Sequence, residues 1–484
     1  MFKELRKNHW IYIIENIIKL FRESYFLIIL AFVNWRNEWW IYPVLGGGIV
    51  LVIIISIVNW NLVKFQVEGN SLIYNKGIIE KKKMKIPFDK ITTIDIGISI
   101  FDRIFNTCSA KVDTGASKIK KSEIKLKIKM DEAKQLKNII LKNNKAVDEE
   151  DIEIDNKDII KKVITGKELL IYAITKGKLI GALGALFIVI QFMKQIEDGL
   201  SLPITEAIDS YVNMDGILGQ STATLILGGF GLLVVIYILI TVIFILYENI
   251  RLYNYTIISD GINISISYGL LNKKEYALPI KKIHALRYRQ GILQQILRIF
   301  TIEAITIGYG DEKNEKALIY PIANKKFIEE VINSLIPQLA FNGEVSKPPK
   351  KAIPLFISKT TLILAAIFVP IAIFISKMPI MLEIIVVLFI VVGNIIFEYI
   401  NYRNTSLGIG KETILATSGR LVKSSIIVKQ SSIQSITMKE SPFKRKTNVC
   451  NFVIDIYTNK FGETVQVLNM DKNLKEDLYN NIIM

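Results

Sequence analysis

Two stretches of this sequence carry no charged side chain and are long enough to cross a lipid bilayer as helices. They cover 39–63 and 216–247, and about 20 apolar helical residues are enough to cross the hydrocarbon core. Further apolar runs lie at 179–193, 360–376, 378–397 and 24–35. The last run reaches only about 18 Å as a helix, so an interfacial helix is the alternative there. The sequence therefore predicts about six transmembrane helices, arranged in three hairpins.

The distribution of charge indicates on which side of the membrane the polar segments lie. The N-terminus carries Lys3, Arg6 and Lys7, whereas the loop 196–216 contains five acidic residues and no Lys or Arg. Lysine and arginine are retained on the cytoplasmic side of membrane proteins. We therefore expect a multi-pass protein of the cell membrane with both termini and the large polar segments in the cytoplasm.

Composition limits the remaining classes of protein. Charged residues make up 22% of the chain, which argues against a bundle of membrane helices joined by short loops. Two cysteines and two histidines cannot form a disulfide framework or a multi-histidine metal site. The net charge of +16 has no aromatic-interleaved basic motif beside it, so membrane anchoring explains it better than nucleic-acid binding. We expect no cofactor.

An internal repeat gives the strongest indication of domain organisation. When three glycines are set in register, an isoleucine follows each of them at the fourteenth position, and a proline follows the first two at the tenth, where the third copy has Lys429. The repeated residues are Gly77, Pro87, Ile91, Gly269, Pro279, Ile283, Gly419 and Ile433. Each copy follows one predicted hairpin, so we interpret each as one module.

Each module has the pattern of a small antiparallel β structure. Alternating segments such as 263–268 and 451–457 are typical of strands. The glycine suits a turn with a positive φ, and the proline suits the end of a strand. An amphipathic helix ends each copy, as at 131–142. About seven strands closed by one helix indicate a barrel like that of pleckstrin-homology (PH) domains, so the expected fold combines six membrane helices with three PH-like barrels.

These patterns divide the chain into eight segments. The hairpins are expected at 1–62, 168–250 and 353–401, the PH-like modules at 63–145, 251–337 and 402–484, and the linkers, the first of them acidic, at 146–167 and 338–352.

The repeat resembles the bacterial PH-domain membrane proteins of the YdbT-like family. Their signature is a glycine with two hydrophobic residues, followed by isoleucine, proline and a later isoleucine. It stands here as Gly77-Ile78-Ile79 before Ile86-Pro87, and as Gly269-Leu270-Leu271 before Leu278-Pro279. The resemblance implies no catalytic residues, and it implies a smaller one-module relative as a partner. It also implies a role in tolerance of membrane-active bacteriocins.

Seven lysines are candidates for contact with anionic lipid headgroups or a partner. One group directly follows the first glycine and the other alternates along a later strand: Lys81, Lys82, Lys83 and Lys85, then Lys125, Lys127 and Lys129. Each cation near an anionic membrane contributes about 1 kcal/mol. The alternative interpretation is a solvated face without a specific ligand.

Glu248 and Glu398 lie the same distance before the second and third glycines, at the predicted ends of membrane helices. A carboxylate there can couple to an ion, or it can simply pair with nearby Arg251 or Arg403. Cys108 and Cys450 also share one position of the repeat, where small buried core residues are expected rather than a redox pair.

No nucleophile–base pair, phosphate loop or metal-ligand spacing is present in the sequence. We therefore expect a protein without enzymatic activity, a membrane-anchored scaffold or binding protein, for which the family resemblance implies a role in envelope defence. The alternative is a transporter or exporter that moves lipid or peptide through the six-helix part. Transport would need charged groups lining the membrane helices.

Overall fold

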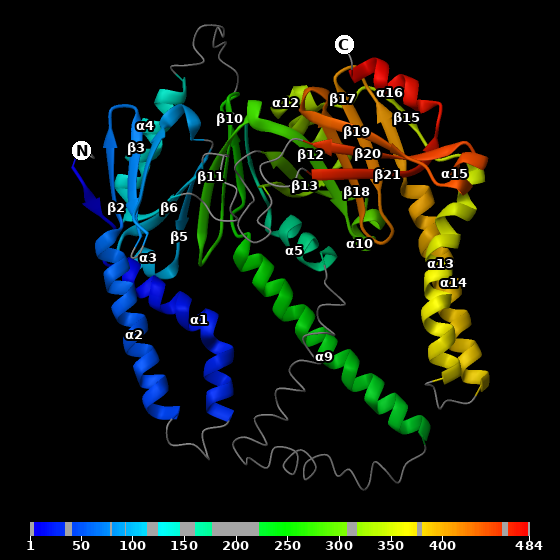
Figure 1. The fold of residues 1–484 in the computed structure, drawn as a ribbon, viewed down its shortest axis with the longest axis horizontal. Helices are drawn as coiled ribbons and strands as arrows, with labels where there is room; N and C mark the ends of the chain where they lie inside the picture. The colour runs from blue at the N-terminus through cyan, green and yellow to red at the C-terminus, as the bar shows by residue number, and fades with distance from the viewer. Residues whose placement is uncertain are drawn as a thin grey trace.

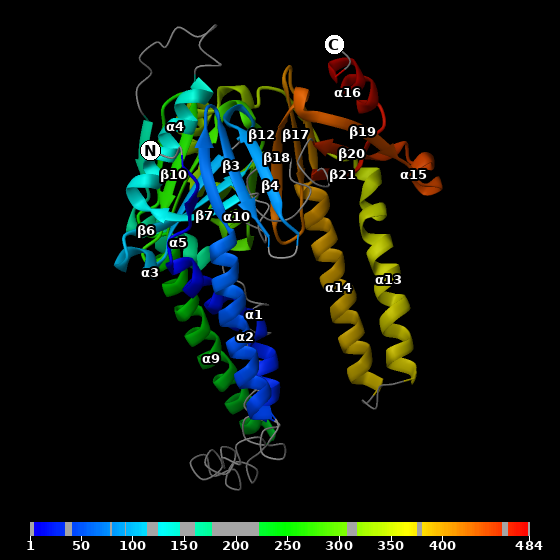
Figure 2. The same ribbon diagram turned by 60° about the vertical axis from the view of Figure 1, so that its left-hand side comes forward.

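The computed structural model describes residues 4–33, 41–77, 80–91, 93–113, 124–145, 160–176, 222–306, 317–374, 380–456 and 463–482. The statements that follow concern these residues. They form β-rich modules from which long helices project to one side (Figures 1 and 2).

Each module contains seven strands among the described residues. Those of the first module are β1 (Arg6–Lys7), β2 (Lys64–Glu68), β3 (Ser71–Lys76), β4 (Lys82–Pro87), β5 (Thr93–Ile98), β6 (Thr107–Asp113) and β7 (Ile124–Lys129). Those of the second are β8 (Ile160–Val163), β9 (Thr256–Ser259), β10 (Asn263–Tyr268), β11 (Lys273–Pro279), β12 (Ile283–Gln290), β13 (Ile299–Thr306) and β14 (Ala317–Asn324). Those of the third are β15 (Glu344–Ser346), β16 (Ser406–Ile409), β17 (Thr413–Ser418), β18 (Lys423–Lys429), β19 (Ile433–Lys439), β20 (Val449–Ile456) and β21 (Glu463–Asp471).

The strands form where the sequence alternates apolar and polar residues. In β10, every second side chain is buried, with Ile264 and Ile266 fully enclosed. Alternation places these side chains on one face of the sheet. A terminal helix then covers the core: α4 (Met130–Lys145) buries Ala133 and Leu136 against the strands of the first module. The corresponding helices are α11 (Lys325–Phe327) to α12 (Asn333–Leu335) and α16 (Leu474–Ile482).

The repeated glycines and prolines have the predicted local structure. Gly77, Gly269 and Gly419 have φ of 116°, 111° and 138°. Residues other than glycine rarely adopt such values. Pro87 and Pro279 each end a strand and precede a short 3-10 helix. The isoleucine fourteen residues after the glycine is buried as Ile91 and Ile283, and half-buried as Ile433.

The sheets cross the boundaries between modules, which corrects the expectation of three separate barrels. Of the four sheets, two have seven strands, in the orders β7-β6-β5-β11-β10-β9-β8 and β14-β13-β12-β18-β17-β16-β15. The first therefore joins modules one and two, and the second joins modules two and three. A four-stranded sheet (β1 to β4) and a three-stranded sheet (β19 to β21) stand at the two ends. Sequence alternation identifies strands but carries no information about which strand lies on an open edge.

The prediction of six transmembrane helices is wrong. Among the described residues, two helical stretches are long and apolar enough to cross a membrane, 350–370 and 384–404. They belong to α13 (Ile353–Phe374) and α14 (Ile380–Asn404), and they correspond to the third predicted hairpin. The run at 179–193 lies outside the described residues. The transporter alternative depended on a six-helix part, so it loses its basis.

Three other long helices lie in or beside predicted spans but are not among the two qualifying stretches of the described residues. Helix α1 (Ile11–Val33) begins with a charged half whose Glu15 bonds to Lys127 of the first module. That half therefore belongs to the β-rich part. Helix α2 (Ile41–Leu62) contributes a shorter apolar stretch, 46–62, among the described residues. Helix α9 (Thr222–Arg251) contains most of the charge-free run 216–247, and it is not one of the two qualifying stretches found among the described residues.

A candidate membrane-interface site

A short helix follows the fifth strand of each module, close to the level at which the long helices leave the sheets (Figure 1). These helices are α3 (Ile100–Ile104), α10 (Ile292–Ile296) and α15 (Pro442–Lys446). In α3, Ser99 and Asp102 form a capping box, which satisfies backbone groups at the start of the helix. In α15, Pro442 occupies the first turn, where its missing N–H is not needed.

The short helices expose large apolar side chains. Counted from the module glycine, Phe101, Leu293 and Phe443 occupy the same position, and they are 48%, 47% and 72% exposed. Ile104 and Ile296 also share a position, and each is 70% exposed. Sequence reasoning missed this site, although the repeated apolar residue at one position of the repeat was a signal that could have found it.

The glycine turns add to this apolar surface. Leu270 and Leu271 in the second module, like Leu421 and Val422 in the third, are partly exposed. The turn of the second module is attached to the end of α9 because the backbone N–H of Leu270 donates to the Ile250 carbonyl at 3.0 Å. The turn of the second module is the glycine–hydrophobic–hydrophobic motif of the sequence, whereas in the third module Arg420 stands between Gly419 and the hydrophobic pair. In both turns the hydrophobic residues face outward rather than into the core.

Each exposed turn touches the short helix of the preceding module. The Arg103 guanidinium of α3 donates to the Leu270 carbonyl. The Gln295 side chain of α10 donates to the Leu421 carbonyl at 3.0 Å. Two composite surfaces result, which we call the junction patches: α3 with the turn 269–272, and α10 with the turn 419–422.

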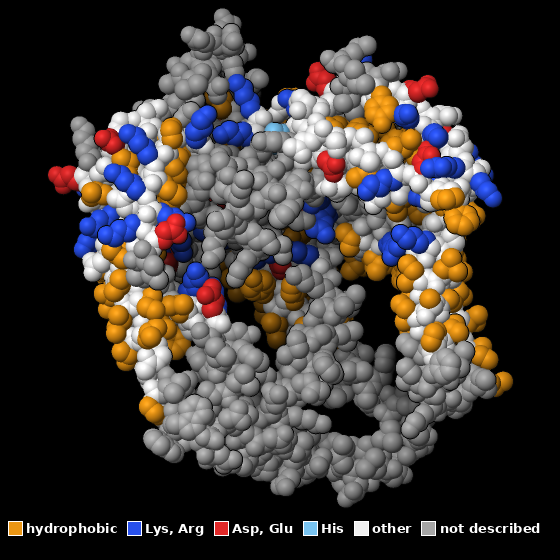
Figure 3. Space-filling view, in the orientation of Figure 1, with side chains coloured by type: hydrophobic (Ala, Val, Ile, Leu, Met, Phe, Trp, Pro, Cys, Tyr) orange, Lys and Arg blue, Asp and Glu red, His pale blue; other side chains and the backbone are white. Residues whose placement is uncertain are grey.

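The junction patches combine apolar side chains with nearby cations. Figure 3 shows apolar side chains along the described helices and Lys and Arg side chains above them. Exposed apolar groups gathered in this way mark a contact with a partner or a membrane. Moving one such side chain out of water is favourable by about 1.5–3 kcal/mol, and each cation near an anionic surface adds about 1 kcal/mol. The arrangement therefore suits the headgroup region of a bilayer.

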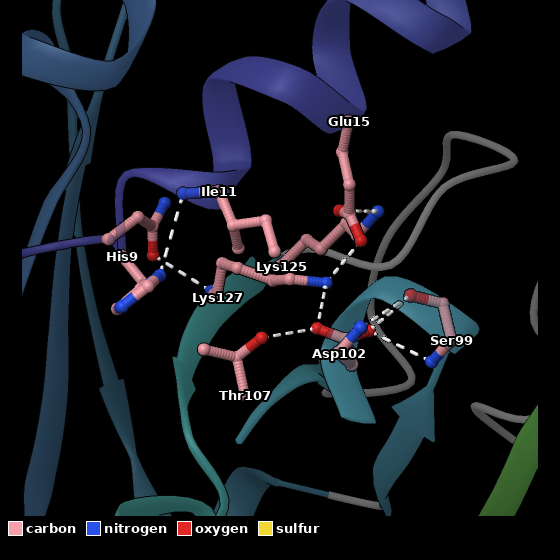
Figure 4. A network of polar contacts seen from close by, with 9 residues as sticks. His9, Ile11, Glu15, Ser99, Asp102, Thr107, Lys125 and Lys127 are labelled. Carbon is pink, nitrogen blue, oxygen red and sulfur yellow. Dashed lines mark hydrogen bonds and ion pairs between the residues drawn. The ribbon is translucent and has the colours of Figure 1, made fainter. Parts of the chain in front are cut away.

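A buried ion network attaches the first module to α1 (Figure 4). Lys127 and Asp102 are almost fully enclosed, and the Lys127 Nζ lies 2.6 Å from Asp102 Oδ1. Lys127 also pairs with Glu15 of α1. The Thr107 hydroxyl donates to Asp102 at 2.6 Å, and the Ser99 hydroxyl does so at 2.7 Å. The network thus links α1, α3 and β7 at the foot of the module.

The backbone strengthens the same junction. The Asn8 side-chain oxygen accepts from the Lys127 N–H at 2.9 Å, and the His9 N–H donates to the Lys127 carbonyl at 2.7 Å. Burial by itself would raise the pKa of Asp102, but the hydrogen bonds from Lys127, Thr107 and Ser99 hold that pKa below its ordinary value. Asp102 therefore stays ionised and keeps the network charged.

Glu248 and Glu398 form buried ion pairs in the second and third modules. Each is only 2% exposed. Glu248 pairs with Lys176 at 3.1 Å and with Arg251 at 3.3 Å. Glu398 accepts from the Thr360 hydroxyl of α13 at 2.7 Å and pairs with Arg420 of the glycine turn. These carboxylates are paired within the fold, and the partner of Glu398 is Arg420 where the sequence suggested Arg403.

Comparison with known proteins identifies the architecture. Residues 12–144, 220–338 and 359–483 match the family described as bacterial PH domain. The chain belongs to the bacterial PH domain family. It is also similar to the UPF0699 transmembrane protein YdbT of Bacillus subtilis (strain 168), with 22% identity over 489 residues, covering 96% of each chain. With its two qualifying helical stretches, this bacterial PH domain protein is a membrane-associated member of the YdbT family.

The predicted lysines of the bacterial PH modules are not all on the surface. Lys82, Lys83 and Lys85 lie exposed on β4, and Lys81 directly precedes that strand. On β7, Lys125 and Lys129 are exposed, and the Lys125 Nζ lies 3.7 Å from Glu15 Oε2 of α1. Lys127 instead points inward and is fully buried in the ion network. The three alternating lysines of β7 therefore do not form one continuous basic face.

Both cysteines are free and buried in the cores of their bacterial PH modules. Burial raises the pKa of Cys108 to about 12 and that of Cys450 to about 11. Because the thiolate is the reactive form, neither thiol is activated for chemistry at neutral pH. His284, on β12, forms a 2.7 Å hydrogen bond with the Ser432 hydroxyl and so connects the second and third modules.

Proposed function

We propose that the chain is a non-catalytic scaffold anchored in the cell membrane, with its PH-like modules held against the cytoplasmic surface of the bilayer. In this role it spans the membrane more than once and keeps both termini in the cytoplasm. The observation that carries the proposal is the exposed apolar residue at one position of the repeat, which is Phe101, Leu293 and Phe443 in the three modules. Three modules that each present one such residue can hold the sheets at a fixed depth on the lipid.

The ligands of the proposed scaffold are membrane lipids and a protein partner. Lysines on β4 and cations on α15, which includes Lys444, Arg445 and Lys446, support contact with anionic headgroups. A smaller one-module PH-domain membrane protein is the partner that the family resemblance suggests. Modules tethered side by side raise the effective concentration of anything they bind together. We place this scaffold in envelope defence, where it lowers the damage done by membrane-active antimicrobial peptides.

Contact between the junction patches and lipid predicts a spectroscopic signal. When Ile104→Cys carries an environment-sensitive dye, its emission will shift to the blue in anionic proteoliposomes relative to the same protein with the dye exposed in denaturant. Nitroxide-labelled lipids will quench it. The reason is that this side chain, 70% exposed to solvent in the structure, enters the headgroup region. The native thiols are buried, so labelling is confined to the new cysteine.

Lys411→Cys is the matched control. It lies in the exposed turn between β16 and β17, at the opposite end of the module from α14. In the same vesicles its dye will keep the emission of a dye exposed to water, and nitroxide-labelled lipids will not quench it. Equal quenching at both positions, or none at Ile104→Cys, would show that the patches do not touch the bilayer.

The defence role predicts a loss of tolerance when the shared apolar position is made polar. Cells that depend on the triple variant Phe101→Ser, Leu293→Ser and Phe443→Ser will be inhibited at a several-fold lower concentration of a cationic membrane-active peptide. Each substitution removes about 1.5–3 kcal/mol of favourable transfer into the interface. A variant with Lys411→Ser and Glu412→Ser serves as the control. Unchanged tolerance at equal protein abundance would remove envelope defence from the proposal.

A further inference from the structure

Neighbouring modules are joined by the same strand pairing at both boundaries. Strand β5 of the first module pairs with β11 of the second, with Ile96 opposite Glu275. Strand β12 of the second pairs with β18 of the third, with Tyr288 opposite Ser425. In both cases the nineteenth residue after one module glycine faces the sixth residue after the next. The boundary is therefore a repeated interface with a fixed register.

This series of pairings stops at β19. Among the described strands, β19 has β20 as its one neighbour, although it corresponds to β5 and β12. Its Ile436 and Met438 are half-buried and alternate with the exposed Ser435 and Thr437. The corresponding residues of β12, Leu286 and Tyr288, are buried beside the strand of the next module. Strand β19 thus has the apolar alternation of an interface strand, and its outer edge has no partner strand within the described parts of the chain.

Beside β19, Arg445 of α15 could form a second contact of the kind found at the internal boundaries. Arg103 and Gln295 occupy the same position after their module glycines, and each donates to a carbonyl of the next module's turn. The third residue of this series is Arg445 on α15, and it is 72% exposed. It pairs with Glu440 of its own module at 3.6 Å. Arg445 therefore stands where a further module's turn would place its carbonyl.

The chain's own β4 is a poor partner for β19. At the eighth position after the glycine, β11 has Ala277 and β18 has Ile427. Both are buried, and Ile427 lies opposite Leu286 of the preceding module. Strand β4 has Lys85 there, with 59% of its side chain exposed. It has Lys83 two residues earlier, and the shared register would set these lysines against Ile436 and Met438. Lysines on an edge strand protect a sheet from unwanted pairing.

We propose that β19 and Arg445 form a docking edge for one further PH-like module carried by a separate chain. The incoming strand corresponds to β4, runs antiparallel to β19 in the register of the internal boundaries, and has small or apolar residues where β4 has Lys83 and Lys85. Its glycine turn accepts a hydrogen bond from Arg445. This inference deepens the proposed scaffold role by naming the partner's chemistry and its place, and it can fail while membrane contact holds.

The chain itself can supply the probe. In the variant Lys83→Ser and Lys85→Ile, β4 acquires the residues of β18 at these positions, Ser425 and Ile427. In detergent, the unmodified chain will be monomeric by light scattering, and this variant will associate head to tail. Adding Ile436→Lys and Met438→Lys will return it to monomers. Adding Arg445→Ala will weaken association about tenfold, the loss expected for one charge-assisted hydrogen bond.

Disulfide trapping tests the register. In the associating variant, Met84→Cys and Thr437→Cys will form a disulfide between chains, because these positions correspond to the internal pair Ile426 and Arg287. Met84→Cys with Gln434→Cys is the control, since it is out of register by three residues, or about 10 Å, and will not crosslink. The single-cysteine variants check folding.

Three results would overturn the inference. One is a variant that stays monomeric although it folds. Another is association that persists with lysines at 436 and 438. The third is association of the unmodified chain through β4 and β19, because β4 would then be the natural occupant. The dye at Ile104→Cys reports membrane contact separately in each case.

Discussion

Replacing Lys127 with methionine will destabilise the first module by about 3–5 kcal/mol, the cost of leaving buried charge without its partner. Methionine matches the volume of the lysine stem, but Asp102 is 1% exposed and would lose its cation. Glu15 of α1 would lose the same partner. The expected result is a lower melting temperature for the detergent-solubilised protein and rapid proteolysis within the first module. A melting curve with limited proteolysis at each temperature measures both.

Lys129→Met is the matched control, because it removes a lysine from the same strand at an exposed position. It should change stability by less than about 1 kcal/mol, as changes of surface charge do. Adding Asp102→Asn and Glu15→Gln to Lys127→Met should recover most of the loss, since no uncompensated charge then remains. Equal stability of Lys127→Met and the unmodified chain would contradict the network.

The effect has a defined dependence on pH. The pKa of Asp102 is lowered in the folded protein, so its contribution is present above its unfolded pKa and is lost as the pH falls through its folded value. In Lys127→Met the Asp102 carboxylate no longer has its cation. Protonation then removes the free-energy cost of keeping this uncompensated charge buried. The gap in stability between the two proteins should therefore narrow as the pH is lowered from neutral toward 4, near the ordinary pKa of carboxyl groups.

Lys127 also marks a limit of reasoning from sequence alone. Alternation along β7 predicts that Lys125, Lys127 and Lys129 lie on one side of the strand, but the structure exposes the first and last and buries Lys127. Which part of that side is covered depends on α1, whose Glu15 lies more than a hundred residues earlier. A single sequence gives the period of a strand, but it does not identify the distant element that packs on one of its residues.

The fold was predictable where local rules determine structure. Three repeated glycines, seven short strands in each module and a terminal helix all follow from turn geometry and periodicity. The count of membrane helices was not predictable in this way, because an absence of charge does not define where the helix leaves the β-rich part. Shared sheets were missed for a related reason: β5 pairs with β11 and β12 with β18, and the two strands of each pair lie far apart in the sequence, in different modules.

The candidate site was also only partly accessible from the sequence. The hydrophobic pair after Gly269 was recognised as a family signature, but a signature does not say whether its residues face the core or the solvent. Leu270 and Leu271 face outward because the turn is held against Ile250 at the end of α9. Their exposure is a property of that attachment.

Gly269→Ala is expected to destabilise the boundary between the first two modules by at least about 3 kcal/mol. Its φ of 111° belongs to a region that alanine avoids at a cost of about 1–3 kcal/mol. An added Cβ would also lie 2.1 Å from the Asn272 carbonyl oxygen, so the backbone of the turn must move. Thermal denaturation of the two proteins, followed by circular dichroism in detergent, measures the loss.

The movement of the turn extends the effect beyond one residue. Leu270 accepts from Arg103 of the first module and donates to α9, so displacing it weakens both attachments. Gly46→Ala is the control, because nothing lies within 4 Å of the Cβ it would add and alanine favours a helix over glycine by about 1 kcal/mol. If Gly269→Ala melted at the same temperature as Gly46→Ala, the turn would not be the rigid link between modules and membrane helices that its contacts indicate. A loss of stability in both Gly269→Ala and Gly419→Ala, but not in Gly46→Ala, would tie the repeated glycine to the way consecutive modules are held in one sheet.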